Sequence, residues 1–230
     1  MLSRSKTAAK HPISHPMVGD ILQNVPVIAI HARFGASEAC FCKDEEIYGE
    51  SEPADCIFEV ISGAVRSYKV LSDGRRQICA FHLPNDIFGL ENGASYRFTA
   101  EAIVETTARV VRRHSLEYVA ASDVRVARNL LSMTARNLLH AEDHMLLLGR
   151  KTSLERVAAF LLEMDHRLTG TGMIALPMSR RDIADYLGLT LETVSRALSY
   201  LRGRGILEFS EMSQRQIVLQ DRAQLRQLDS

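Results

Sequence analysis

Residues 179–198 read SRRDIADYLGLTLETVSRAL, and this pattern predicts two short helices that meet at a tight corner. Ala184 is small enough for the helices to cross closely, and Gly188 permits the positive φ that such a corner often needs. Thr190 can cap the second helix by accepting from a backbone N–H in its first turn. The apolar residues are spaced to form one inner face: Ile183, Leu187, Leu189, Val194 and Leu198. The stretch predicts a DNA-binding helix-turn-helix, and an ordinary helical hairpin is the alternative.

Four side chains remain on the outer side of the second helix: Leu191, Glu192, Ser195 and Arg196. Glu192 can accept a hydrogen bond from a cytosine amino group, and Arg196 can donate two to guanine. Ser195 can bond several base edges, and Leu191 can make apolar contact with a thymine methyl. Because Glu192 and Arg196 are four residues apart, a plain exposed ion pair between them is the alternative. We predict that this face reads DNA bases.

The residues that open the two helices complete the predicted DNA-binding set. Ser179 and Arg180 begin the first helix, and Ser179 with Asp182 forms the Ser-x-x-Asp pattern of a capping box. A second hypothesis places this end near a DNA phosphate, where an added negative charge would repel DNA. Thr190 lies where the second helix begins.

The composition is that of an ordinary globular protein, with 46% hydrophobic and 24% charged residues among 230. This length suggests one or two domains. Lys plus Arg and Asp plus Glu both number 28, so the whole molecule exerts no strong non-specific attraction on nucleic acid. No apolar run is long enough to cross a bilayer, and the amino terminus lacks a signal-peptide core. We expect a cytoplasmic protein with no membrane partner.

The first half of the chain carries short β-rich runs with turn signals between them. The runs are 47–48, 57–61, 65–70, 77–81 and 108–111, and the turns are 62–63, 72–74 and 84–86. Many short strands at regular spacing predict a small antiparallel roll or barrel. Residues 1–25 lack any periodicity and are expected to form a mobile extension.

A long helix is predicted from about residue 122 to residue 149. Apolar or small residues recur there in steps of four and three: Ala127, Leu131, Thr134, Leu138, Ala141, Met145 and Leu148. This heptad seam is typical of a helix that packs along a partner helix. A second stripe, through Val126, Leu130 and Met133, can cover the roll of the same chain. Two stripes favour a homodimer over a helix buried within a monomer.

The last third predicts a winged helix. An amphipathic helix over 153–162 can support the helical pair, and strands at 206–209 and 216–219 flank a turn. The predicted fold class is α+β, with an N-terminal antiparallel β-roll, a long dimerisation helix and a C-terminal winged helix-turn-helix. The predicted boundaries are an extension over 1–25, the roll over 26–121, the dimerisation helix over 122–149 and the DNA-binding domain over 150–230.

Together these motifs resemble the CRP/FNR superfamily of bacterial transcription factors, from about residue 25 to the carboxy end. In the roll, the similar segments are IYGE at 47–50, FEVISGAV at 58–65, GRRQI at 74–78 and NDIFG at 85–89. The segment LTLETVSR at 189–196 resembles the reading helix of the oxygen-regulator branch, and is most similar to rhizobial FixK-type activators.

The resemblance implies a cyclic-nucleotide-binding-like roll and a homodimer on a palindromic promoter. The Glu-x-x-Ser-Arg pattern at 192–196 matches the branch that reads TTGAT-type half-sites, whereas the cyclic-AMP branch usually has Arg at the position of Leu191. The resemblance also implies an activator whose exposed turn contacts RNA polymerase, and the turn is Leu71, Ser72, Asp73, Gly74 and Arg75. A plain hairpin turn is about equally compatible with the sequence.

No metal or cofactor is expected. Relatives with an iron–sulfur cluster hold it through four cysteines, whereas Cys40 and Cys42 are the only close pair here. Without an export signal all four cysteines are expected to be thiols: Cys40, Cys42, Cys56 and Cys79. His140 and His144 lie one helical turn apart and can bind a metal, but an exposed helix face is the commoner explanation.

Three other functions remain as alternatives. Cyclic-nucleotide binders of the superfamily carry Arg-Ser or Arg-Thr after the phosphate-binding Gly-Glu, whereas Phe98 separates Arg97 from Thr99 here. A cyclic-nucleotide-responsive regulator is therefore the alternative within the same fold. A metal-dependent β-roll enzyme is the alternative of another class, but His82 stands alone in the strand region, and we expect no catalytic site. A ligand-binding module without DNA contact leaves the 191–196 face unexplained.

Overall fold

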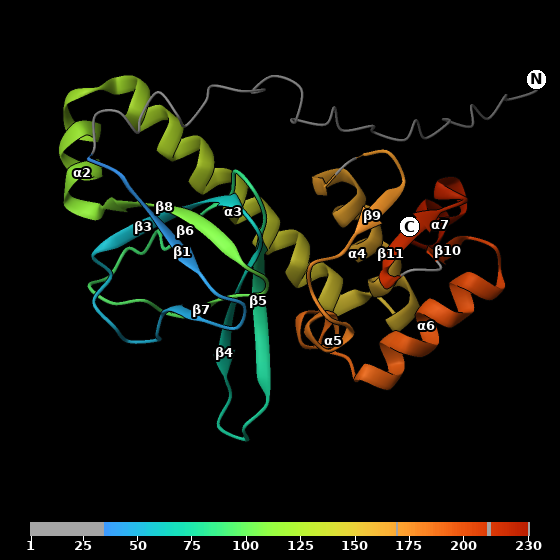
Figure 1. The fold of residues 1–230 in the computed structure, drawn as a ribbon. Helices are drawn as coiled ribbons and strands as arrows, with labels where there is room; N and C mark the ends of the chain where they lie inside the picture. Colours follow the sequence, from blue (N-terminus) through green and yellow to red (C-terminus); the bar gives the residue numbers. More distant parts are fainter. Residues whose placement is uncertain (1–34, 169, 211–212, 230) are drawn as a thin grey trace, which may run out of the picture.

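The computed structural model describes residues 35–168, 170–210 and 213–229. The chain forms a β-rich body, a long helix and a C-terminal helical body with a small sheet (Figure 1). The predicted extension over residues 1–25 lies outside the described residues. Among the helices that the structure describes, none combines the length and the apolar character needed to cross a bilayer.

Eight strands form the β-rich body as two antiparallel sheets, with the orders β1-β8-β3-β6 and β2-β7-β4-β5. They are β1 (Ser37–Phe41), β2 (Glu46–Tyr48), β3 (Cys56–Ser62), β4 (Val65–Val70), β5 (Arg76–His82), β6 (Ile87–Phe88), β7 (Thr99–Ala102) and β8 (Thr106–Arg112). The antiparallel roll is confirmed. The sequence did not predict β1, β6 and β7, which are short; β7 reads TAEA and has little intrinsic β propensity.

The interior of the roll contains a packed aromatic cluster. The ring of Tyr48 stacks on that of Tyr96 with centroids 3.7 Å apart, and it lies 5.5 Å from Phe58 and 6.1 Å from Phe88. The Tyr96 hydroxyl donates to the Cys56 carbonyl at 2.7 Å, so this polar end of the stack is satisfied. The two sheets of the roll are therefore joined by a hydrophobic core.

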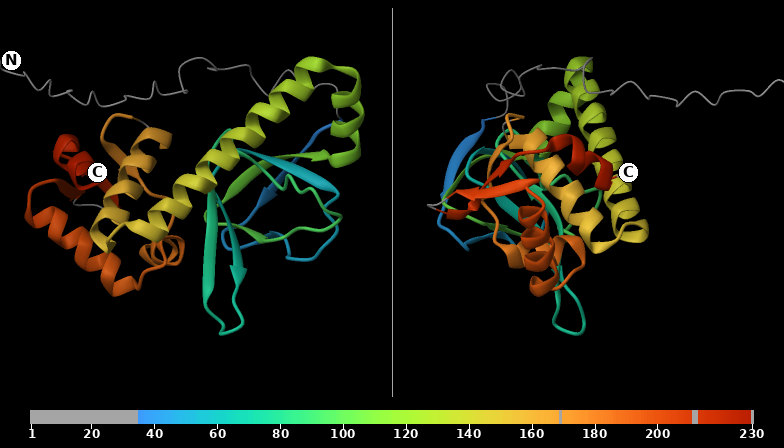
Figure 2. Two further views of the ribbon diagram at one scale, coloured as in Figure 1. Left: turned by 180° about the vertical axis from the view of Figure 1, so that it is seen from behind. Right: turned by 90° about the vertical axis from the view of Figure 1, so that its right-hand side faces the viewer.

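Two helices follow the roll, α2 (Arg113–Ser122) and α3 (Val124–Arg150). Asp123 separates them: its carboxylate accepts from the Arg125 backbone N–H and caps α3, which therefore begins two residues later than predicted. From α2, α3 runs across the roll to the C-terminal body (Figures 1 and 2). Val126 is buried in a cluster with Ile57 and Val111, and Leu130 packs against it. The predicted second stripe therefore covers the roll at Val126 and Leu130, and its third residue, Met133, is buried as well.

The C-terminal body is a winged helix-turn-helix, as predicted. Its elements are α4 (Ser153–Leu168), β9 (Met173–Ala175), α5 (Arg180–Leu187), α6 (Leu191–Gly203), β10 (Leu207–Ser210), β11 (Ser213–Leu219) and α7 (Arg222–Asp229). The three strands form an antiparallel sheet in the order β10-β11-β9. The sequence did not predict β9 and α7, since both are short and join the fold through partners distant in the chain.

The two bodies share one hydrophobic core. Phe81 on β5 packs against Tyr186 on α5 and Phe160 on α4, with ring centroids 5.0 and 6.2 Å apart. The core continues through Ile78 on the roll side and Leu187 on the C-terminal side. This packing crosses from one body to the other. The predicted domain boundaries near residues 121 and 149 therefore stay a prediction.

Candidate nucleic-acid interface

The first helix of the motif, α5, is fixed at both ends by its own sequence. The Ser179 hydroxyl accepts from the Asp182 N–H at 3.1 Å, and the Asp182 carboxylate accepts from the Ser179 N–H at 2.9 Å. This is the predicted capping box. At the other end Gly188 adopts a φ of 62°, and the Leu189 N–H donates to the Ala184 carbonyl at 2.9 Å. Local chemistry therefore makes the corner that the sequence predicts.

The second helix, α6, begins at its predicted cap and turns its apolar side inward. The Thr190 hydroxyl accepts from the Thr193 N–H at 3.2 Å. The buried side chains of the helix join the core shared with α4 and α5: Val194, Ala197, Leu198 and Leu201. The opposite side of α6 faces away from the rest of the chain (Figure 1).

This outer side carries the four predicted base-reading residues. Glu192 and Arg196 are exposed, and Leu191 and Ser195 are half-buried. The pKa of the Glu192 carboxyl lies below its usual value, because its own backbone N–H and the Thr190 hydroxyl donate to it and cationic Arg181 and Arg196 are near. Glu192 is therefore ionised at neutral pH, as an acceptor for a base amino group must be.

The residues that open α5 already have local partners. The Ser179 hydroxyl donates to Asp182 Oδ2 at 2.6 Å, and the Arg180 guanidinium lies over the Phe209 ring, 5.3 Å from its centroid. Both side chains are half-buried, whereas Thr190 is exposed. The structure gives Ser179 and Arg180 structural roles, and DNA contact by these two and by Thr190 stays a prediction.

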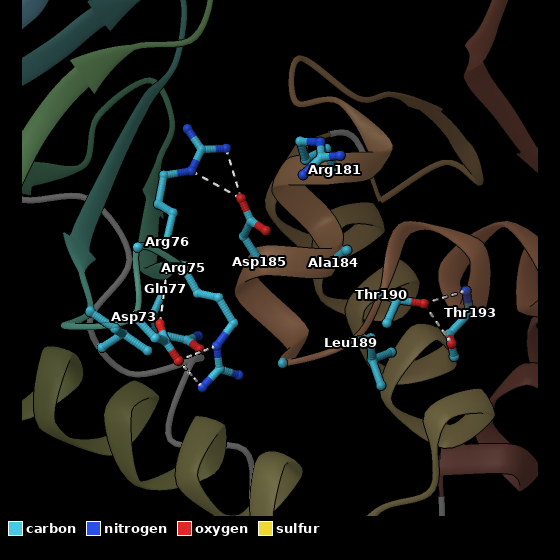
Figure 3. A pocket seen from close by; sticks show the side chains of 13 residues that line it. Asp73, Arg75, Arg76, Gln77, Arg181, Ala184, Asp185, Leu189, Thr190 and Thr193 are labelled. Atoms are coloured by element: carbon cyan, nitrogen blue, oxygen red, sulfur yellow. Dashed lines mark hydrogen bonds and ion pairs between the residues drawn. The ribbon is translucent and has the colours of Figure 1, made fainter.

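A hollow of about 880 Å³ lies between the turn joining β4 to β5 and the start of α6 (Figure 3). Arg75 lines it from the turn, where its Nε donates to Asp73 Oδ2 at 2.7 Å, and Arg181 lines it from α5. Arg181 is exposed. The sequence signal for it is a cluster of arginines in and after the motif, where DNA phosphates would lie: Arg180, Arg181, Arg196, Arg202 and Arg204.

The predicted polymerase-contacting turn projects from the roll beside the C-terminal body (Figure 1). The Leu71 N–H donates to the Arg75 carbonyl at 2.8 Å, and Gly74 adopts a φ of +81°. All five residues of the turn are exposed: Leu71, Ser72, Asp73, Gly74 and Arg75. The turn is therefore a well-formed hairpin end that another protein can reach, and contact with polymerase stays a prediction.

The outer face of α3 exposes the heptad seam. Leu131, Leu138 and Met145 are 71%, 59% and 63% exposed, and Ala127, Thr134 and Ala141 are exposed between them. Leu148 differs, because it is half-buried and packs on the shared core. The seam prediction missed two further exposed apolar residues one position along, Leu139 and Leu146. The spacing of seven between Leu139 and Leu146 was the sequence signal for them. The apolar face of α3 consists of the exposed large apolar residues Leu131, Leu138, Leu139, Met145 and Leu146.

Glu91 and Arg97, which the cyclic-nucleotide alternative would use, have other partners in the roll. The Glu91 carboxylate accepts from the Arg97 N–H at 3.3 Å, and the exposed Arg97 guanidinium lies over the Phe98 ring, 5.3 Å from its centroid. The stacked rings of Tyr48 and Tyr96 occupy the neighbouring interior. The Glu91 carboxylate is thus occupied by the backbone of Arg97, and the Arg97 guanidinium stacks on its own neighbour, so this arrangement does not favour the cyclic-nucleotide alternative.

The cysteines and the histidine pair show no metal-binding arrangement. All four cysteines are free, which confirms the thiol prediction, and Cys40 and Cys42 are exposed. Within residues 35–168, 170–210 and 213–229, no three His, Cys, Asp or Glu side chains are grouped to hold a metal ion. The exposed-face explanation is wrong for His144, which is half-buried and stacks on Tyr186 with centroids 4.2 Å apart, whereas the His140 side chain is 38% exposed. Burial is the main cause that lowers the pKa of His144 to about 4.

Two protein families match successive parts of the chain. Residues 38–123 match the cyclic nucleotide-binding domain, and residues 155–228 match the Crp-like helix-turn-helix domain. The first match covers the roll from β1 through α2, and the second covers α4 through α7.

Three known proteins are similar to most of the chain. The nitrogen fixation regulation protein FixK of Azorhizobium caulinodans is 46% identical over 84% of this chain and 79% of its own length. FixK of Rhizobium meliloti is 43% identical over 74% of this chain and 77% of its own. The structure of FixK2 from Bradyrhizobium japonicum matches with a TM-score of 0.82 and 67% identity, covering 85% of this chain and 98% of that one. The chain therefore belongs to the CRP/FNR family of transcription regulators and is FixK-like.

Proposed function

We propose that the protein binds DNA as a homodimer at a palindromic TTGAT-type site and activates transcription by contacting RNA polymerase. The observation that carries the proposal is the outer face of α6, where ionised Glu192 and exposed Arg196 lie one helical turn apart. The inner side of the same helix is anchored in the core, so the two charged groups are presented by a rigid element.

The chemistry of the two groups specifies different bases. A carboxylate can accept from the cytosine N4 amino group, and a guanidinium can donate to both O6 and N7 of guanine. Ser195 lies between them and can approach a thymine methyl with its methylene, as can Leu191. Arg181 and Thr190 lie beside this face at the start of α6, where groups that contact phosphate fix the position of the helix.

The apolar face of α3 supports the homodimer. Large apolar side chains exposed in a row along a helix are unfavourable in water, and a second copy of α3 would bury them in a coiled-coil-like seam. A two-fold dimer presents two copies of α6, so the DNA site is an inverted repeat with half-site centres about 34 Å apart.

The projecting turn from Leu71 to Arg75 supports the activator role. It is exposed, ends a rigid hairpin and lies on the same chain as the reading helix, so a bound dimer can present it to polymerase on the promoter.

The proposal is tested by equilibrium titration of the full chain with a duplex that carries inverted TTGAT half-sites and with a duplex of scrambled sequence. Affinity should fall steeply with salt for both duplexes, because phosphate contacts release counterions, and should differ between them by at least about 10³-fold. Equal affinity for the two duplexes, or no binding to either, contradicts the proposed function.

A further inference from the structure

Four charged residues join the roll to the first helix of the DNA-binding motif. Arg66 on β4 donates from Nη1 to Asp182 Oδ1 at 3.2 Å, and Arg76 on β5 donates from Nη2 to the same oxygen at 2.6 Å. Arg76 also donates from Nε to Asp185 Oδ2 at 2.9 Å, as Figure 3 shows. We call Arg66, Arg76, Asp182 and Asp185 the interdomain ion cluster.

The centre of the cluster is buried, unlike an ordinary surface ion pair, whereas Arg76 and Asp185 are partly exposed. The side chains of Arg66 and Asp182 are only 9% and 5% exposed. Arg66 is held from its own side as well, by Asp44 at 3.2 Å and by Glu101. A buried pair adds little net stability over an apolar substitute, but removing one partner leaves an uncompensated charge. Such a cluster selects one relative placement of the two bodies and penalises the others.

Asp182 has two structural tasks. Its Oδ2 accepts from the backbone and hydroxyl of Ser179 and completes the α5 capping box, while its Oδ1 accepts from the two roll arginines. Burial alone would raise the pKa of the Asp182 carboxyl, but the Ser179 hydrogen bonds and the Arg66 and Arg76 charges together outweigh it and hold the pKa below its usual value. The residue that fixes the first turn of α5 therefore also fixes where α5 sits on the roll.

Neighbouring contacts extend the same junction. The Gln77 side-chain amide donates to the Tyr186 carbonyl at 3.4 Å, and the rings of Phe81 and Tyr186 are 5.0 Å apart. Helix α5 is in turn packed on α6 through the shared core. A continuous path of packed elements therefore runs from the roll through α5 to the reading face of α6.

From this geometry we infer that Arg66 and Arg76 are positioning residues for DNA recognition: the interdomain ion cluster fixes the angle of α6 relative to α3. This inference rests on the proposed function. In a dimer joined through α3, that angle sets the distance and rotation between the two reading helices. The cluster thus determines which spacing between half-sites the dimer accepts, although none of its four residues needs to touch a base.

The inference predicts a change in spacing selectivity, which is the ratio of the affinities for duplexes with the unaltered and the altered spacing between half-sites. A general loss of stability would lower both affinities and leave this ratio unchanged. Inserting one base pair between half-sites moves one of them by ~3.4 Å and rotates it by roughly 35°. We expect the wild-type protein to lose on the order of tenfold in affinity or more on this insertion, since one half-site no longer meets α6. In Arg76→Gln, the C-terminal body is held less firmly against the roll, so the loss of affinity on inserting one base pair should be less than about threefold. Binding to both duplexes should be weaker than in the wild type.

The experiment measures fluorescence anisotropy of labelled duplexes with the unaltered spacing, with one inserted base pair and with scrambled half-sites. The variants are Arg76→Gln, the charge-conserving Arg76→Lys, and Asp185→Asn as an independent disruption at a less buried position. Lys69→Gln is the matched control, because Lys69 lies on the neighbouring strand and pairs with Glu50 within the roll at 2.6 Å. Thermal melting confirms that each variant is folded.

We expect Arg76→Gln and Asp185→Asn to lose spacing selectivity, Arg76→Lys to recover part of it, and Lys69→Gln to behave as wild type. All four should retain discrimination against scrambled half-sites, because the reading face is intact. If Arg76→Gln does not fold, Asp185→Asn alone decides. Unchanged spacing selectivity in the folded cluster variants overturns the inference and leaves the proposed function standing. If the wild-type protein binds neither specific duplex, the proposed function itself fails and the inference falls with it.

Discussion

At the scale of single residues, the best-predicted features are those made by neighbours in the chain. Ser179 and Asp182 are three residues apart, and the capping box between them follows from residue type and spacing. The partners of Asp182 across the junction could not be predicted, because Arg66 and Arg76 are 116 and 106 residues away and no local pattern marks them. Exposure of Glu192 and Arg196 follows from helical periodicity, whereas their contact with bases is a proposal.

Truncating a base-reading residue should change specificity more than affinity for arbitrary DNA. Glu192→Ala or Arg196→Ala should cost about 1–3 kcal/mol of discrimination at one base pair of each half-site, since one bidentate or acceptor contact is lost. The measurement is a titration of each variant against the palindrome and against duplexes substituted at single positions. Arg204→Ala, a charge loss at the exposed carboxy end of α6, is the control. Equal weakening on every duplex would argue that the two residues contact only phosphate.

Two histidines should make the protein less stable as the pH falls. Burial is the main cause that lowers the pKa of His82 and of His144 from the ordinary 6.5 to about 4; near His82, the charge of Asp86 opposes this shift and those of Arg167 and His140 add to it. The folded protein then stays neutral at these sites while the unfolded chain takes up protons below about pH 6.5. The free energy of unfolding should therefore fall from pH 6.5 to 4, by up to ~1.4 kcal/mol per pH unit for each histidine.

Replacing one histidine isolates its contribution. His82 Nε2 lies 2.8 Å from the Ser67 hydroxyl, a contact that an amide can keep. Urea unfolding across this pH range gives the slope of the unfolding free energy against pH. In His82→Gln this slope should correspond to about one proton fewer than in the wild type, because only His144 still titrates. An identical slope in the two proteins would mean that His82 takes up as many protons in the folded protein as in the unfolded chain, so that folding does not lower its pKa.

At the scale of elements, long periodic segments were predictable and short ones were not. The seam and the roll-facing stripe of α3 follow from heptad spacing over many turns. Strands β1, β6, β7 and β9 are two to five residues long and obtain their hydrogen bonds from strands far along the chain. Their existence depends on tertiary pairing and not on local propensity.

The apolar face of α3 should be the dimer interface. Leu138→Glu places a charge in the middle of the seam, where burial against a second helix would desolvate it, so the protein should become monomeric. Because Leu138 is exposed within one chain, the melting temperature of the monomer should change little. Met173→Glu is the matched control, since Met173 is an equally exposed apolar residue on β9. Light scattering during size-exclusion chromatography measures both masses, and a dimer of Leu138→Glu would place the interface elsewhere.

At the scale of the whole molecule, the fold class and the order of its parts were predictable, but the junction was not. The roll, long helix and winged helix each carry their own pattern, so the sequence places them in order. How the bodies meet depends on side chains from β4, β5, α4 and α5 that come together only in the folded chain, such as Phe81 and Tyr186. The reading helix is therefore oriented by contacts that no single segment encodes.

The projecting turn should separate activation from DNA binding. Replacing Ser72 and Arg75 together by alanine keeps Gly74 and the hairpin, and it removes exposed groups that a polymerase subunit can recognise. We expect unchanged affinity for the palindrome and reduced transcription from a promoter that carries it, measured in a reconstituted reaction with purified polymerase. Full transcription by the variant would leave the turn as a simple hairpin end.

The most direct test of the central claim is selection of bound duplexes from a random DNA pool by the full chain. Two subunits joined along α3, each presenting Glu192 and Arg196, should select an inverted repeat with half-site centres about 34 Å apart and with conserved G and C positions in each half. A pool without symmetry, or symmetric half-sites at variable spacing, would contradict a dimer that holds its two reading helices at a fixed separation.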